Sequence, residues 1–348
     1  MKTLVARLGL VGLGCAVAAS ASSAAPAAAT SDATTTLASV SSGGAQGDLY
    51  SYAIAITAHG RYVLFSSDAR NLVAGDTNGR TDAFVRDRLT GKTSRVSVSS
   101  SGAQARRSSD PFGGSNAGGI SADGRNVVFR SDASNLVAHD TNGAEDIFVH
   151  NRRTGRTTRV NVSSSGRQAD GWSGSPTISA DGRYVAFVSS ASSLVPGDTN
   201  GTVDVFVRDR LAGRTRRVSI SSRGRQANGG CEEPSISAHG RYVAFASPAS
   251  NLVTGDSNDI SDVFVRDRWT GHTRRISISS RGLQSTGSPT RTGSNAPSIS
   301  AHGRYVAFHS DASNLVRGDT NRVFDMFVHD RMTGKTRRVS VGDRKSVV

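Results

Sequence analysis

The sequence predicts an all-β fold in which five repeats each form one four-stranded antiparallel sheet. A pattern of the form Ile-Ser/Thr-Ala-Asp/His-Gly-Arg followed by an apolar run begins at residues 56, 120, 178, 236 and 299. Each copy is followed by an Asp-x-Asn loop, a Phe-Val pair and an arginine-rich run. Self-similarity at a fixed period is the signature of a repeat architecture, and no segment has the 3.6-residue apolar period of a helix.

The third repeat illustrates the expected elements. Asp181-Gly182 predicts a hairpin turn, because both residues tolerate positive φ, and residues 190–203 form a long loop. The four predicted strands are residues 177–180, 183–189, 204–208 and 215–221. Four such strands describe one blade of a β-propeller. One apolar position is equivalent in all repeats and is expected in the core between blades: Phe84, Phe148, Phe206, Phe264 and Phe327.

The repeats fill most of a single predicted propeller domain, residues 30–348. Five full repeats are visible, at approximately 49–101, 115–165, 174–222, 232–280 and 295–342. A further copy of the last strand, residues 36–42, precedes the first repeat and predicts an extra edge strand. We expect a closed five-bladed ring, and a six-bladed ring with one incomplete blade is the alternative.

Two segments of the third repeat carry a resemblance to a known family. Residues 175–187 read Ser-Pro-Thr-Ile-Ser-Ala-Asp-Gly-Arg-Tyr-Val-Ala-Phe, and residues 204–209 read Asp-Val-Phe-Val-Arg-Asp. This pattern resembles the TolB-like, WD-repeat-like β-propeller family over almost the whole mature chain. The resemblance implies a propeller, with six blades in that family, and it is specific for fold rather than for function.

The N-terminus has the pattern of a cleaved signal peptide, residues 1–29. Lys2 and Arg7 are basic, residues 8–19 are apolar and small, and residues 27–29 offer a small-x-small cleavage site. The mature chain is therefore expected to be secreted, with no membrane span. An uncleaved anchor, or a lipoprotein attached through Cys15, is the alternative. Cleavage would leave Cys231 as the lone cysteine, without an intramolecular disulfide.

The Asp-x-Asn loops are candidate calcium sites. Closely spaced carboxylate and amide oxygens are the ligands that Ca²⁺ prefers, although no copy has the distal glutamate of an EF-hand loop. Asp and Asn also cap turns through their own backbone, which is the alternative. The candidate ligands are Asp76, Asn78, Asp82, Asp140, Asn142, Asp146, Asp198, Asn200, Asp204, Asp256, Asn258, Asp262, Asp319, Asn321 and Asp325.

Residues that break the repeat are candidate ligand-binding residues. They concentrate in the loops that join one repeat to the next, and a ligand over the central channel would contact them. They are Tyr50, Tyr52, Arg106, Phe112, Trp172, Glu232, Glu233 and Arg291.

Charge is expected to separate between the two faces of the propeller. The Asp-x-Asn loops belong to one face, and arginine-rich turns such as 208–210 belong to the other. The net charge is +14, which favours anionic surfaces such as wall polymers or lipid headgroups. The sequence has no basic helix and no aromatic ladder for nucleic acid.

The sequence contains no recognisable catalytic motif. A His-Glu-x-x-His zinc motif, a nucleophile elbow and a phosphate-binding loop are all absent. The predicted function is therefore an exported, non-enzymatic and monomeric scaffold that binds a protein or an anionic cell-envelope polymer. The alternatives are a glycosidase or lyase acting over the central channel, and a calcium-stabilised structural module.

Overall fold

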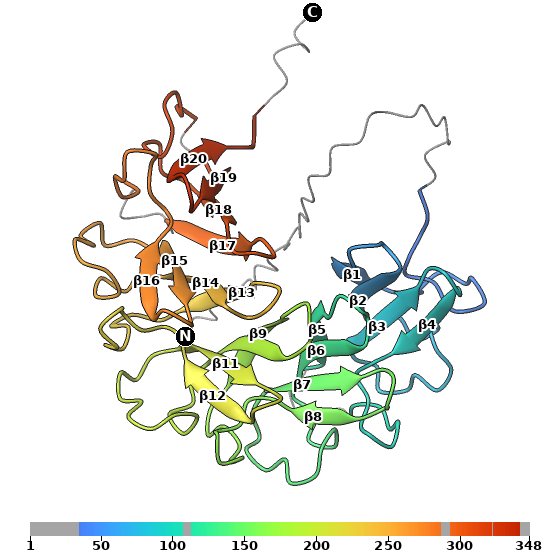
Figure 1. Ribbon diagram of the computed structural model, residues 1–348. Coiled ribbons are helices and arrows are strands. Elements are labelled where there is room, and N and C mark those ends of the chain that lie inside the picture. Colours follow the sequence, from blue (N-terminus) through green and yellow to red (C-terminus); the bar gives the residue numbers. More distant parts are fainter. Residues whose placement is uncertain (1–34, 107–112, 287–292, 322, 342–348) are drawn as a thin grey trace, which may run out of the picture.

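The computed structural model describes residues 35–106, 113–286, 293–321 and 323–341, which form five four-stranded β-sheets and no helix (Figure 1). Each repeat forms one sheet, here called a blade. Blade 1 contains β1 (Ser51–Ile56), β2 (Tyr62–Ser67), β3 (Asp82–Asp87) and β4 (Lys92–Arg95). Blade 2 contains β5 (Ser115–Ile120), β6 (Asn126–Ser131), β7 (Asp146–Asn151) and β8 (Thr157–Arg159), and blade 3 contains β9 (Ser173–Ile178), β10 (Tyr184–Ser189), β11 (Asp204–Asp209) and β12 (Arg214–Arg217). Blade 4 contains β13 (Glu232–Ile236), β14 (Tyr242–Ser247), β15 (Asp262–Asp267) and β16 (His272–Arg275), and blade 5 contains β17 (Ser294–Ile299), β18 (Tyr305–Ser310), β19 (Asp325–Asp330) and β20 (Lys335–Arg338). The predicted all-β class and the five full repeats are confirmed.

Within each blade the strands pair antiparallel in chain order. In blade 3, β10 and β11 are in register from Tyr184 opposite Asp209 to Ser189 opposite Asp204. Phe187 and Phe206 therefore lie directly opposite each other, with ring centroids 5.9 Å apart. The same stacked pair of phenylalanines recurs in every blade.

The hydrophobic core lies between consecutive blades. Val205 and Val207 of blade 3 pack in one cluster with Val243 and Phe245 of blade 4. A blade of alternating β-branched and aromatic residues thus buries both faces only when it has a neighbour on each side. The five equivalent phenylalanines named above are each 0% exposed. Four of them lie in clusters that join two blades, as predicted, whereas Phe84 packs with Phe65, Ala69 and Leu72 of its own blade.

The segment after the fourth strand of blades 1 to 4, here called the linker, binds to the next blade. The side chain Oγ1 of Thr273 in blade 4 donates to the carbonyl of Ile220 at 2.6 Å. Arg266 Nη1 likewise donates to the carbonyl of Ser221 at 3.0 Å. These contacts explain why the predicted fourth strand 215–221 ends earlier, at Arg217: beyond that residue the chain leaves its own sheet to cross to blade 4.

The predicted edge strand 36–42 is also a linker. Val40 makes a single β-bridge to Gln46, and Thr93 Oγ1 of blade 1 donates to the Val40 carbonyl at 2.5 Å. This repeats the contact between Thr273 and Ile220. The segment therefore occupies on blade 1 the position that the linker of a preceding blade would occupy.

The five blades follow an open arc, with blades 1 and 5 at its ends (Figure 1). Ile276 of blade 4 is 2% exposed because blade 5 covers it, whereas Val339, at the equivalent position after β20, is 52% exposed. Phe324 at the same end is 48% exposed. The described residues thus form an arc rather than the closed ring that we expected, because no further blade covers these side chains.

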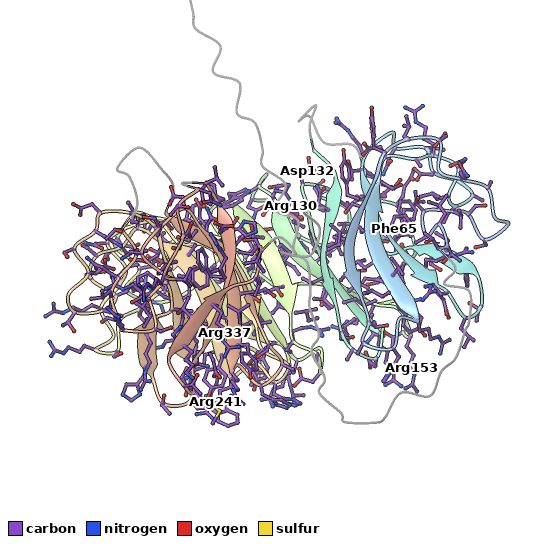
Figure 2. All side chains as sticks on the ribbon, turned by 90° about the horizontal axis from the view of Figure 1, so that it is seen from above. Phe65, Arg130, Asp132, Arg153, Arg241 and Arg337 are labelled. Carbon is purple, nitrogen blue, oxygen red and sulfur yellow. The ribbon has the colours of Figure 1, made fainter. Side chains whose placement is uncertain are left out.

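The two faces of the arc are built from different connections. The turns between first and second strands and between third and fourth strands lie on one face, here called the turn face. The loops between second and third strands and the linkers lie on the opposite loop face. In Figure 2, Arg153 and Arg241 lie at the lower edge, on the turn face, and Arg130 and Asp132 lie near the upper edge. The predicted placing of the Asp-x-Asn loops and arginine turns on opposite faces follows from this topology.

No helix among the described residues is long and apolar enough to cross a membrane. The predicted signal peptide 1–29, with Cys15, lies outside the described residues. Phe112 and Arg291 do so as well.

Candidate functional site

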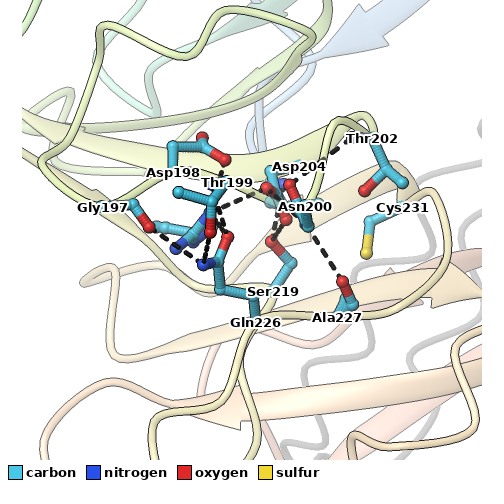
Figure 3. Close-up of polar contacts among 12 residues, drawn as sticks. Gly197, Asp198, Thr199, Asn200, Thr202, Asp204, Ser219, Gln226, Ala227 and Cys231 are labelled. Carbon is cyan, nitrogen blue, oxygen red and sulfur yellow. Dashed lines mark hydrogen bonds and ion pairs between the residues drawn. The ribbon is translucent and has the colours of Figure 1, made fainter.

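Each Asp-x-Asn loop is held by a buried hydrogen-bond network, shown for blade 3 in Figure 3. Asn200 Nδ2 donates to Asp204 Oδ2 at 3.0 Å, and Ser219 Oγ donates to Asp204 Oδ1 at 2.5 Å. Arg217 Nη1 lies 2.8 Å from Asp198 Oδ1 and 3.0 Å from Asp204 Oδ2. One guanidinium therefore joins the two carboxylates of the loop.

The same network recurs in all five blades. The arginine that joins two aspartates is, in blade order, Arg95, Arg159, Arg217, Arg275 and Arg338. Burial raises the pKa of Asp82, Asp140 and Asp256 to about 6, because the carboxylate loses its hydration. The network therefore stabilises the loop face in the same way in each blade.

The predicted calcium ligands are thus close together, but their oxygens already accept hydrogen bonds. Both oxygens of Asp204 are used by Ser219, Asn200 and Arg217, and Arg217 supplies the positive charge that Ca²⁺ would bring. The described residues contain no group of three or more His, Cys, Asp or Glu arranged to hold a metal. The donor set as it stands does not fit Ca²⁺. Calcium binding stays a prediction, and it would require the arginine to move.

Cys231 occupies a position that is serine in the other blades. There, a first-strand hydroxyl is hydrogen-bonded to a second-strand hydroxyl, in the pairs Ser51–Ser67, Ser115–Ser131, Ser173–Ser189 and Ser294–Ser310. Cys231 Sγ instead lies 3.4 Å from Ser247 Oγ, and the cysteine is 0% exposed. Burial raises the pKa of this thiol to about 12, so it stays protonated and is not a nucleophile.

The described members of the predicted ligand-binding set come from different blades and linkers. Tyr50 and Tyr52 lie at the beginning of blade 1, and Arg106 is exposed with its backbone N–H bonded to Asn135 Oδ1. Glu232 is exposed on β13. No hydrogen bond or ion pair between the described residues joins two of the predicted ligand-binding residues. Their role in binding stays a prediction.

Glu233 has a structural contact instead of a free carboxylate. Its φ is 51°, at the irregular pairing of β13 with β14, and its Oε2 accepts the backbone N–H of Ala296 at 2.5 Å. The side chain thus ties blade 4 to blade 5. Glycosidase chemistry needs two carboxylates that face one bond, and this contact directs Glu233 away from such a role.

Trp172 belongs to a polar cluster that sequence reasoning missed. Its Nε1 donates to Glu145 Oε2 at 2.7 Å, and Arg130 Nη1 donates to the same oxygen at 3.1 Å. Trp172 remains 38% exposed. Arg130 stands where the other repeats have Ser, Val, Ala or His, and this departure from the repeat is the signal that could have identified the cluster.

The turns between third and fourth strands fix the arginines of the turn face. Arg183 donates from Nε and Nη2 to the two oxygens of Asp209, at 2.9 and 2.7 Å. Asp209 Oδ1 also accepts the backbone N–H of Leu211 at 3.1 Å, which closes the turn. The bonds from Arg183 lower the pKa of Asp209 to about 2. Blades 1, 4 and 5 have the same bidentate pair.

A second set of arginines stacks on tyrosines across the blade boundaries. The Tyr184 ring of blade 3 lies between Arg183, at 4.9 Å, and Arg268 of blade 4, at 4.5 Å. Tyr62 and Tyr242 have equivalent partners. Burial lowers the pKa of Arg268, and the nearby charges of Arg216 and Arg183 act in the same direction. Guanidinium groups therefore crowd this face.

Several exposed cations of the turn face have no acidic partner. The residue after the glycine of each third-to-fourth-strand turn is basic in every repeat: Lys92, Arg156, Arg214, His272 and Lys335. All five are exposed, and none forms an ion pair with another described residue. The aspartates of these turns already bind arginines, so the face carries uncompensated positive charge.

Comparison with known proteins finds a likeness of fold only. No protein-family model matches the sequence, and no curated protein matches it. Among solved structures, TolB from Acinetobacter baumannii is 16% identical over 83% of this chain and 56% of its own length, with a TM-score of 0.45. An oligogalacturonate lyase in complex with manganese is 14% identical over 85% of this chain and 78% of its own length, with a TM-score of 0.43. A structure from a study of two prolyl endopeptidases is 11% identical over 86% of this chain and 37% of its own length, with a TM-score of 0.50. At such identities the names indicate no activity for this chain.

Proposed function

We propose that the chain is an exported, non-enzymatic scaffold that binds an anionic component of the cell envelope through its turn face. The uncompensated cations after the turn glycines carry this proposal. A surface of one charge sign concentrates and holds a polymer of the opposite sign. On the loop face, the central arginines are used within the Asp-x-Asn networks, and exposed arginines such as Arg167, Arg281 and Arg317 lie in the surrounding loops and linkers.

The regular spacing of the blades supports a polymeric ligand. Blades 1, 2, 3 and 5 present a lysine or an arginine at this position and blade 4 a histidine, so one extended anion could contact several blades in turn. Many weak contacts along one chain give a high combined affinity, because each later contact forms within the same complex.

The test is salt-dependent binding of a soluble polyanion. The mature chain should bind polyphosphate at low ionic strength and release it as salt screens the charges. A variant with Lys92→Gln, Arg156→Gln, Arg214→Gln and Lys335→Gln should bind at least about tenfold more weakly. Arg70→Gln, Arg223→Gln, Arg281→Gln and Arg317→Gln remove as much charge from the loop face and serve as the matched control. Equal loss in both variants would show that net charge, and not the turn face, binds the polymer.

A further inference from the structure

The turn face also carries large apolar side chains at its tips. One equivalent turn position holds Leu89, Leu211, Trp269 and Met332, which are 75%, 79%, 70% and 77% exposed, and in blade 2 it holds Arg153. Single exposed apolar residues are common on soluble proteins. Here the repeat places four of them at the same point of four blades, on one face of the molecule.

The tips are held in a fixed conformation. The backbone N–H of Leu211 donates to Asp209 Oδ1, and that of Trp269 donates to Asp267 Oδ1 at 3.0 Å. The same contact supports Leu89 and Met332. Each supporting aspartate is in turn bound by an arginine of the neighbouring turn. The apolar tips are thus presented in a defined arrangement, and a binding partner need not order them.

A lysine or arginine lies three residues beyond three of the four apolar tips. Lys92 follows Leu89, Arg214 follows Leu211, and Lys335 follows Met332. Arg153 in blade 2 places a further cation at the tip position itself, at the lower edge of Figure 2. Apolar and cationic side chains therefore alternate along one face.

We propose that the turn face binds to the surface of an anionic lipid bilayer. The apolar tips insert among the headgroups, and the surrounding arginines and lysines contact the lipid phosphates. This combination of apolar residues with Lys and Arg is what interfacial binding requires, and tryptophan is enriched at that depth of a membrane. The inference rests on the proposed function, because it assigns the anionic component that the same face binds.

The apolar tips favour a bilayer over a soluble polymer. A hydrated polyanion would use the cations but would leave Leu211, Trp269 and Met332 in water. A bilayer accepts both groups, because its phosphates lie directly above the acyl chains. Burial of the tips adds an attraction that salt does not screen, so part of the binding should persist when the charges are screened.

The experiment measures co-sedimentation of the mature chain with vesicles. The protein should bind vesicles that contain phosphatidylglycerol and should bind vesicles of phosphatidylcholine alone at least about tenfold more weakly. A four-tip variant with Leu89→Ser, Leu211→Ser, Trp269→Ser and Met332→Ser should lose at least about tenfold in affinity for the anionic vesicles. A control variant replaces two exposed leucines of the loop face, Leu49→Ser and Leu283→Ser, which are 48% and 58% exposed. Circular dichroism checks that both variants are folded.

Polyphosphate binding separates the two proposals. The four-tip variant should bind polyphosphate as the unchanged protein does, since its cations remain. In a Trp172→Phe background, the emission of Trp269 should shift to shorter wavelength on anionic vesicles and should not shift on polyphosphate. If the four-tip variant binds the vesicles normally, or if the protein binds polyphosphate but no vesicles, the bilayer inference is wrong and the proposed function stands. If the protein binds neither, both are wrong.

Discussion

Arg268 of blade 4 lies over the ring of Tyr184 of blade 3, with its guanidinium carbon 4.5 Å from the ring centroid. Gly240 of blade 4 permits this approach, because a Cβ at that position would lie 2.2 Å from Tyr184 Cδ2. The contact joins two consecutive repeats. It also shows how the turn face holds many arginines with few carboxylates: aromatic rings provide part of the electrostatic compensation.

Replacing Gly240 with alanine should destabilise the protein through this contact. The substitution places a methyl group against the Tyr184 ring and also strains a φ of 69°. Gly155→Ala is the matched control, since its φ is 71° and no atom lies within 4 Å of the added Cβ. We expect the control to cost about 1–2 kcal/mol and Gly240→Ala to cost about 1–3 kcal/mol more. Urea unfolding measures both, and equal losses would contradict the close packing of the ring.

The Arg183–Asp209 pair should make stability depend on pH in acid. The bonds from Arg183 lower the pKa of Asp209 to about 2, against a usual 3.8. The stabilisation is therefore fully present above about pH 4, and it is lost as the pH falls toward 2. Arg183→Gln should reduce the free energy of unfolding at pH 6 and should have little effect near pH 2. Urea unfolding at several pH values tests this. A difference that is the same at pH 6 and pH 2 would exclude the ion pair as its cause.

Arg217 should be essential for the loop of blade 3. Arg217→Met removes the guanidinium between Asp198 and Asp204 and leaves buried carboxylates without a counter-charge. Breaking such a buried pair costs about 3–5 kcal/mol. Arg216→Met, on the exposed side of the same strand, should change the free energy of unfolding by about 0.5 kcal/mol or less. Similar effects of the two substitutions would show that the network contributes little.

Thermal melting of the unchanged protein tests calcium. A ligand that binds only the folded state must raise the melting midpoint. Because Arg217 and its equivalents already neutralise the aspartates, we expect the same midpoint with excess Ca²⁺ and with excess chelator. A higher midpoint in Ca²⁺ would establish the predicted calcium sites and would mean that the arginines can be displaced.

At the open end of the arc, a residue is exposed whose equivalent in the preceding blade is buried. Ile276 is 2% exposed and Val339 is 52% exposed, although both follow the fourth strand of their blade. Ile276→Ala should cost about 2–5 kcal/mol, as in other buried cores, whereas Val339→Ala should cost about 0.5 kcal/mol or less. Chemical denaturation provides the comparison. A large loss at Val339 would indicate that blade 5 is covered in solution.

Residues 36–42, at one end of the arc, show what the repeat pattern cannot predict. The sequence of residues 36–42 is a close copy of a last strand, so it was predicted to pair at a sheet edge. In the structure the same pattern in the first four repeats continues past its strand and binds the next blade as a linker. The pattern correctly indicated an extended segment. The local alternation of side chains does not encode which distant segment it pairs with.

The sequence also predicted one part of the candidate site and missed another. The sequence placed the Asp-x-Asn loops and the arginine turns on opposite faces, because antiparallel strands alternate the ends from which connections leave. It did not show that Arg217 lies between Asp198 and Asp204, because Arg217 is nineteen positions from Asp198 and thirteen from Asp204 in the chain. Oxygens that look like metal ligands in the sequence are hydrogen-bond acceptors in the structure.

By itself the sequence determined the repeat, the four strands of each blade and the turns that join them, because these depend on a side-chain period of two and on residues that tolerate positive φ. Only the tertiary structure decided that the blades form an open arc and that one guanidinium serves two carboxylates in each loop. Only it also showed that Leu89, Leu211, Trp269 and Met332 point into water on one face. These features depend on which surfaces remain uncovered and which charges meet after packing, and both follow from the relative placement of segments far apart in the chain.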